Sequence, residues 1–246
     1  MHAPKATSTT YCIIRENGSM EQNLMNTLLF GVYPYICLTI WLLGSLIRFD
    51  REQYTWKSDS SQLLRRRMLR MGSNMFHFGI LIVVIGHFVG FLTPHWLVSA
   101  FLNASQHQLL AMAGGGAAGI VAIIGLTMLL YRRLFDSRVR INSAHADMLV
   151  LVLLWVQLAL GLLTVPMSMQ HMDGAMFETL SDYIKGIVTF NPSPALIAGA
   201  PLVYKAHIAL GFTIFLVAPF TRLAHIWSGW ATVGYLFRPR QIVRRR

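Results

Sequence analysis

The stretch between Arg70 and Arg132 contains no lysine, arginine, aspartate or glutamate. It is long enough for two membrane crossings, since one helical crossing takes about 20 residues. Over the whole chain 54% of the residues are hydrophobic and 13% are charged, and the mean hydropathy is +0.51. These values are typical of a chain that lies mostly in lipid. The sequence therefore predicts an integral membrane protein.

Five hydrophobic runs are each long enough to cross a bilayer as a helix of about 20 residues. They cover roughly Thr27 to Ile47, Met75 to Val98, Leu109 to Tyr131, Met148 to Met169 and Leu202 to Trp227. Backbone polar groups in lipid must be hydrogen-bonded within the chain, so runs of this length favour helices. We therefore expect an all-α integral membrane bundle of five transmembrane helices.

Basic residues gather in three places relative to these runs. Seventeen of the 21 Lys and Arg residues lie between the first and second runs, between the third and fourth, and at the C-terminal end. The positive-inside rule therefore predicts an N-terminus outside and a C-terminus in the cytoplasm. The expected location is the cell inner (cytoplasmic) membrane. The net charge of +11 is then a matter of topology, and no nucleic-acid partner is expected. The stretch MFETLSDYIKGIVTF, between the fourth and fifth runs, is expected outside, on the membrane surface.

Two histidines lie in the second run and two in the fifth. His77 and His87 are ten residues apart, about 15 Å along a helix, while His207 and His225 are 18 residues apart, about 27 Å. Because these two runs cross in opposite directions, we expect His87 to lie level with His207, and His77 with His225. The unequal spacings require tilt or curvature. The sequence thus predicts two facing imidazole pairs at two depths.

An ionisable side chain inside a membrane indicates a functional site, because burying it without a partner is costly. The only two cysteines, Cys12 and Cys37, cannot form a Cys-ligated cluster. Two imidazoles across a gap suit the axial positions of a haem iron, and Gly79, Gly86 and Gly90 would let a flat macrocycle approach. Helix packing is the alternative for any one of these histidines and for the glycines. A histidine-lined proton or metal transporter is another alternative, and it predicts no haem absorbance.

Four segments carry a resemblance to a known family: SNMFHFGILIVVIGHFVGFLTPHW, RRLFDSRVR, GLLTVPMSMQHMDG and LVAPFTRLAHIWS. They closely resemble the membrane subunit of respiratory nitrate reductase, its gamma chain or cytochrome b subunit. The resemblance runs in order from about Met20 to the end of the chain. It implies a five-span dihaem cytochrome b domain at residues 20–237 and a basic cytoplasmic tail at 238–246. We expect residues 1–19 to be a dispensable polar tail and translation to begin at Met20.

The resemblance also implies cofactors, ligands and partners. In that family two b haems are stacked across the membrane, and the ligand positions fall on His87 with His207 for the outer haem and His77 with His225 for the inner one. The implied function is quinol oxidation near the outer face, with menaquinol or ubiquinol as substrate. Electrons pass inward through both haems to an iron–sulfur beta subunit and a molybdenum-containing alpha subunit, which reduces nitrate. The released protons contribute to the proton motive force.

Further residues are assigned around this framework. His107 stands where the family characteristically carries a lysine thought to help bind quinol, and a neutral imidazole can accept a proton near pH 7. We expect His107, with Gly86 and Gly90, to bind quinol, and Arg222 to pair with a haem propionate. A dihaem anchor of a related sulfur-compound oxidoreductase would share the four ligands, so it stays an alternative.

Overall fold

The computed structural model describes residues 21–51, 66–141, 143–170 and 172–226. Its elements, in chain order, are η1 (Leu28–Val32), α2 (Tyr33–Arg51), α3 (Arg66–Leu92), α4 (His95–Ser99), α5 (Ala104–Phe135), α6 (Ser137–Ile141), α7 (His145–Ser168), α8 (Ala175–Val188), α9 (Ala195–Ala198), α10 (Leu202–Val217), η2 (Ala218–Phe220) and η3 (Arg222–Ala224). η1 is a π-helical turn, and η2 and η3 are 3₁₀ turns. Over the described residues the predicted all-α class is confirmed. The predicted tails, 1–19 and 238–246, lie outside those residues.

Within the described part of the chain, five helices are long and apolar enough to cross a membrane, as the sequence predicts. They cover Glu21–Arg51, Arg67–Leu92, Ala104–Phe135, His145–Ser168 and Leu202–Phe220. The second is shifted toward the N-terminus relative to the predicted run, because the chain leaves the helix after Leu92 and Pro94 starts the separate helix α4. The amphipathic stretch between the fourth and fifth long helices forms α8.

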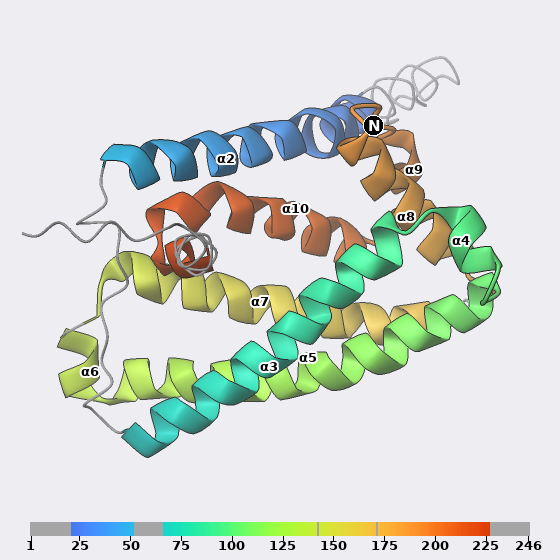
Figure 1. Cartoon of the computed structure of the whole chain (residues 1–246). Helices are drawn as coiled ribbons and strands as arrows, with labels where there is room; N and C mark the ends of the chain where they lie inside the picture. The colour runs from blue at the N-terminus through green and yellow to red at the C-terminus, as the bar shows by residue number, and fades with distance from the viewer. Residues whose placement is uncertain (1–20, 52–65, 142, 171, 227–246) are drawn as a thin grey trace, which may run out of the picture.

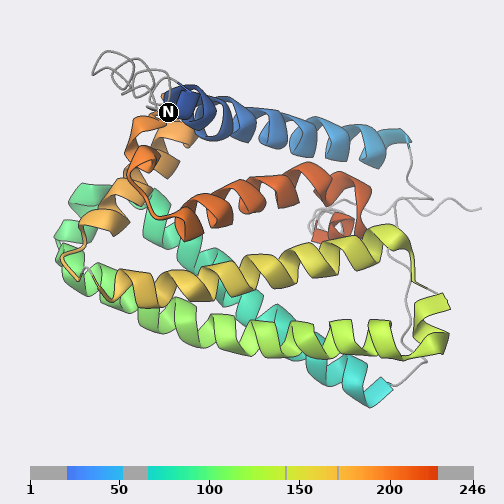
Figure 2. The same cartoon turned by 180° about the vertical axis from the view of Figure 1, so that it is seen from behind.

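The long helices form a bundle in which α3 crosses the others obliquely (Figures 1 and 2). Close packing joins α3 to α5, α5 to α7, α7 to α10 and α10 to α2. One end of the bundle, the arginine end, holds residues Arg48, Arg70, Arg132, Arg133 and Arg222. The opposite end, the α8 end, is covered by α4, α8 and α9 (Figure 1). Within the described residues, α3 and α10 are not among the closely packed helix pairs.

The α3–α5 contact depends on small residues. A Cβ at Gly79 would lie 2.5 Å from the Ala118 carbonyl oxygen and 2.6 Å from the Ala122 nitrogen. Gly72 likewise meets Gly125 on α5, where a Cβ would lie 3.0 Å from the Gly125 carbonyl oxygen. The two backbones approach so closely that no side chain fits between them. The expectation that Gly79 leaves room for a macrocycle is therefore wrong, because Gly79 faces α5.

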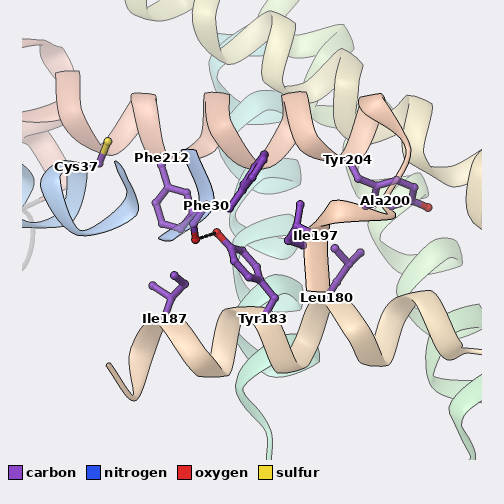
Figure 3. Close-up of a cluster of buried hydrophobic side chains, with 9 residues drawn as sticks. All are labelled: Phe30, Cys37, Leu180, Tyr183, Ile187, Ile197, Ala200, Tyr204 and Phe212. Carbon is purple, nitrogen blue, oxygen red and sulfur yellow. Dashed lines mark hydrogen bonds between the residues drawn. The ribbon is translucent and has the colours of Figure 1, made fainter. Parts of the chain in front are cut away.

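A cluster of buried side chains at the α8 end fastens α8 to the first long helix and to α10 (Figure 3). The Tyr183 hydroxyl on α8 donates a hydrogen bond of 2.9 Å to the Phe30 carbonyl in the π-turn η1. The two rings also meet edge to face, with centroids 6.4 Å apart. Burial raises the pKa of the Tyr183 phenol, which therefore remains a hydrogen-bond donor. This contact holds α8 across the end of the bundle.

The last predicted run is not one helix. α10 ends at Val217, and the chain continues as the turns η2 and η3, with Thr221 extended between them at φ −128° and ψ 179°. Pro219 lacks the amide hydrogen that a continuing helix needs. Arg48 of α2 supports the break by donating a 3.1 Å hydrogen bond to the Pro219 carbonyl. The predicted continuation of the helix through this region is therefore wrong, and His225 lies after the break.

Candidate functional site

Four histidines of the described residues form two facing pairs. One histidine of each pair lies on α3, and the other lies on α10 or directly after η3. The His87 and His207 ring centroids are 6.2 Å apart and the rings are tilted by 37°. The His77 and His225 centroids are 6.0 Å apart, with an angle of 69° between the rings. These are the partners expected from the antiparallel order of the helices. His207 and His225 are farther apart in the sequence than His77 and His87, yet both pairs face each other. The break after Val217 explains this, because His225 does not lie on a continuation of α10.

For three of the four histidines, a hydrogen bond determines which ring nitrogen can bind a metal. The His87 Nδ1 lies 2.8 Å from the Val83 carbonyl, and the His77 Nδ1 lies 2.8 Å from the Ser73 carbonyl. The His225 Nδ1 lies 2.6 Å from the Arg222 carbonyl. A carbonyl accepts only from a protonated nitrogen, so in the neutral form of each of these rings Nε2 is the nitrogen that carries the lone pair. Such a second contact is usual for histidines that bind metal.

His207 is held differently. Its buried Nδ1 has no hydrogen-bond partner within the described part of the chain. The Gln157 side-chain nitrogen of α7 donates to the His207 carbonyl at 3.0 Å and lies 3.4 Å from its Nε2. Gly161 packs on the ring edge, because a Cβ there would be 3.0 Å from the His207 Cε1. α7 therefore sets the position of this ring.

The geometry of the pairs fits a shared metal ion. A bond from imidazole nitrogen to metal is about 2 Å long, so two imidazoles on opposite sides of one ion have ring centroids roughly 6 Å apart. Within the described residues, no three His, Cys, Asp or Glu side chains gather as a metal site. A metal between either pair would therefore take its other ligands from a non-protein group such as a porphyrin.

Two glycines of α3 have different surroundings. A Cβ at Gly86 would meet nothing within 4 Å, so the backbone beside His87 borders open space. A Cβ at Gly90 would lie 3.4 Å from the Phe177 ring of α8. Gly86 can thus lie against a flat ligand, whereas Gly90 lies beneath α8.

Aromatic rings connect His107 to His87 at the α8 end. The His107 ring meets Phe177 of α8 edge to face, with centroids 4.7 Å apart. Phe177 stacks on Phe91 at 5.3 Å, and Phe91 contacts His87 at 5.6 Å. His107 and His87 are therefore neighbours separated by two phenylalanine rings. Phe177 is a residue of this site that sequence reasoning missed, because nothing local marks which face of α8 covers α3.

Arg222 lies in a cluster of charged residues at the arginine end. Its Nη2 is 3.8 Å from an Asp147 carboxylate oxygen, which also lies 3.6 Å from the Arg133 Nη1. Arg132, next to Arg133, is only 1% exposed. Sequence reasoning counted Arg132 and Arg133 as loop charges and missed Asp147. A lone carboxylate at the start of an apolar helix was the available signal.

In the described part of the chain, five long apolar helices and two facing histidine pairs define a multi-pass helical membrane protein with paired imidazoles between its helices. Comparison with known families narrows this class, since residues 26–246 match the model of the nitrate reductase gamma subunit. The chain belongs to the nitrate reductase gamma subunit family, a family of b-type cytochromes.

Individual relatives support the assignment to this family. The chain is 46% identical to the respiratory nitrate reductase 1 gamma chain of Escherichia coli, over 90% of this chain and 98% of the relative. It is 39% identical to the nitrate reductase gamma chain of Bacillus subtilis, over 89% and 98% of the two chains. A more distant relative, 26% identical over 82% of this chain and 58% of its own, is an Hdr-like menaquinol oxidoreductase cytochrome b-like subunit from Archaeoglobus profundus.

These findings establish the function expected from the resemblance. The chain is a gamma, or cytochrome b, subunit of respiratory nitrate reductase and serves electron transport by oxidising quinol. It lies in the cell membrane, and a gamma subunit works in complex with alpha and beta subunits. Neither a sulfur-compound oxidoreductase nor a transporter is supported.

Proposed function

We propose that each facing pair holds one haem b, His87 with His207 and His77 with His225. The ring separations of 6.2 Å and 6.0 Å carry this proposal, because they match two ligands on one iron. Bound haem supplies one-electron transfer between ferric and ferrous iron. The chain supplies the ligands, their fixed orientation and an apolar surrounding.

The proposed topology places the arginine end in the cytoplasm and the α8 end outside. Arg48, Arg132 and Arg133 all lie at the arginine end of the described chain, as the positive-inside rule requires of a cytoplasmic face. His87 and His207 then form the outer pair, and His77 and His225 the inner pair.

Quinol is proposed to bind at the α8 end, beside the outer pair. His107 is separated from His87 by Phe91 and Phe177, and Gly86 borders open space next to His87. An imidazole there can accept the proton of a quinol hydroxyl. Protons released at this end leave on the outside while electrons move inward, so oxidation separates charge and contributes to the proton motive force. Gly90 contributes backbone beneath Phe177.

At the opposite end, Arg222 is proposed to bind a propionate of the inner haem in addition to Asp147. The arginine end is also the proposed docking face for the iron–sulfur beta subunit, which passes electrons to the molybdenum-containing alpha subunit. Residues 52–65, part of the basic segment assigned to this face, lie outside the described residues.

Replacing one ligand of each pair tests this arrangement. His225→Ala should remove the inner haem from purified complex, while quinol still reduces the outer one. His87→Ala should remove the outer haem and prevent quinol from reducing the remaining one, although an artificial donor to the catalytic partners still supports nitrate reduction. The readouts are reduced-minus-oxidised spectra and the rate of haem reduction by quinol.

Two results would contradict the proposal. Loss of quinol-driven haem reduction in His225→Ala, with retention in His87→Ala, would reverse the inside and outside assignment. Wild-type complex without bis-histidine b-type bands would exclude haem ligation by these pairs.

A further inference from the structure

The inner ligand His225 has a support that differs from that of the histidines on α3. The carbonyls that accept from His77 and His87 belong to Ser73 and Val83, four residues earlier in one continuous helix. The carbonyl that accepts from His225 belongs to Arg222, in the three-residue turn η3 after the extended Thr221. The helix α10 therefore does not hold this carbonyl in place.

Asp147 supplies a tertiary contact to that turn. It lies in the first turn of α7, where a negative charge is favoured by the helix dipole, and its side chain is 12% exposed. One of its carboxylate oxygens is 3.8 Å from the Arg222 Nη2 and 3.6 Å from the Arg133 Nη1 of α5. Asp147 thus joins η3 to α5 and α7. Its largely buried position reduces screening by water.

We propose that Asp147 is a positioning residue for the inner haem ligand, acting through Arg222. The carboxylate holds the Arg222 side chain, and the Arg222 carbonyl holds the Nδ1 of His225 at 2.6 Å. With this contact intact, the His225 ring stays facing His77. This inference rests on the proposed haem ligation and adds the residue that orients the ligand outside the long helices.

Positioning and simple electrostatics predict different results in a double-mutant cycle. A through-space effect of the Asp147 charge on the inner haem should persist when Arg222 is changed. An effect transmitted by Arg222 should vanish in an Arg222→Gln background, because the contact is already lost. Arg133→Gln removes the other ion pair of Asp147, and Arg133 does not contact His225 in the way that Arg222 does.

The experiment uses the purified wild-type complex and the variants Asp147→Asn, Asp147→Glu, Arg222→Gln, Arg133→Gln and the double variant Asp147→Asn/Arg222→Gln. The measured quantities are the rate at which each haem is lost to haem-free myoglobin, and the electron paramagnetic resonance spectrum of each oxidised haem. Asp182→Asn is the matched control, because that carboxylate pairs with Lys185 at the same 3.8 Å but lies on α8 and is 67% exposed.

Asp147→Asn and Arg222→Gln should each speed inner-haem loss about tenfold, the size of effect expected when the partner of a metal-bound histidine is removed. The inner-haem spectrum should shift while the outer-haem spectrum stays as in wild type. The double variant should lose the inner haem no faster than either single variant. Asp147→Glu should restore most of the retention, and Arg133→Gln and Asp182→Asn should resemble wild type.

Additive effects in the double variant, or an inner haem unaffected by Asp147→Asn, would overturn the inference. If the asparagine chain does not accumulate, Arg222→Gln decides: wild-type retention of the inner haem in that variant also overturns it. Wild-type complex lacking two haems would instead overturn the ligation itself, so the two failures are distinguishable.

Discussion

Gly161 is the residue whose size most directly controls a ligand. A Cβ at this position of α7 would lie 3.0 Å from the His207 Cε1, so Gly161→Ala should displace the ring from its position opposite His87. We expect a shifted spectrum and lower occupancy of the outer haem, with the inner haem unchanged. Gly114→Ala is the control, because a Cβ there meets nothing within 4 Å. Equal spectra for both variants would show that the ring tolerates the methyl group.

His107 offers a second test at the same scale. His107→Ala should slow reduction of the outer haem by quinol and leave both haem spectra intact, because the ring contacts Phe177 and is not one of the four proposed ligands. His107→Lys should keep part of the activity. The measurement is stopped-flow haem reduction at several quinol concentrations, and unchanged kinetics in the alanine variant would remove His107 from the quinol site.

At the residue scale, the depth of each histidine and the alternating direction of the spans are enough to predict that His87 faces His207, and the two ring centroids lie 6.2 Å apart. The roles of Gly79 and Gly86 did not follow, because they depend on how α3 is rotated about its axis. Gly79 faces α5 and Gly86 faces open space, although Gly79 closely follows His77 and Gly86 directly precedes His87.

At the scale of elements, the close contact between α3 and α5 should be sensitive to a single methyl group. Gly79→Ala places a Cβ 2.5 Å from the Ala118 carbonyl, so the helices must separate. We expect a loss of about 1–3 kcal/mol in the free energy of unfolding, the usual cost of overpacking. Unfolding in mixed detergent micelles measures it. Gly115→Ala, which meets no atom within 4 Å, should be neutral, and equal stability of the two variants would contradict the packing.

The break between α10 and η3 shows what apolar length alone cannot reveal. The run from Leu202 onward is hydrophobic enough to span, and averaging over it conceals Pro219 and the extended Thr221. The signal was present as a proline within a helical pattern. The contact of Tyr183 with the Phe30 carbonyl lacks any such signal, since it joins residues 153 positions apart.

For the whole molecule, the proposed orientation predicts which end reacts with a membrane-impermeant thiol reagent. Phe190, 82% exposed at the α8 end, and Ile141, 83% exposed at the arginine end, are matched sites. In a Cys12→Ser background, Phe190→Cys should be labelled in intact spheroplasts. Ile141→Cys should be labelled only after the membrane is opened. The reverse pattern would place the arginine end outside.

The number and order of the long helices were predictable because lipid requires uninterrupted apolar length. How those helices pack was not, since the oblique path of α3 results from contacts such as Gly79 against Ala118, which are distant in sequence.

The break after Val217 also determines where the chain tolerates insertions and deletions. One residue added between His77 and His87 would turn one imidazole by about 100° relative to the other and move it by about 1.5 Å, since both belong to a single helix. One residue added beside Thr221 changes a segment that no helical repeat constrains. Among homologous sequences, the number of residues between His77 and His87 should therefore be invariant. The number of residues between His207 and His225 is free to vary.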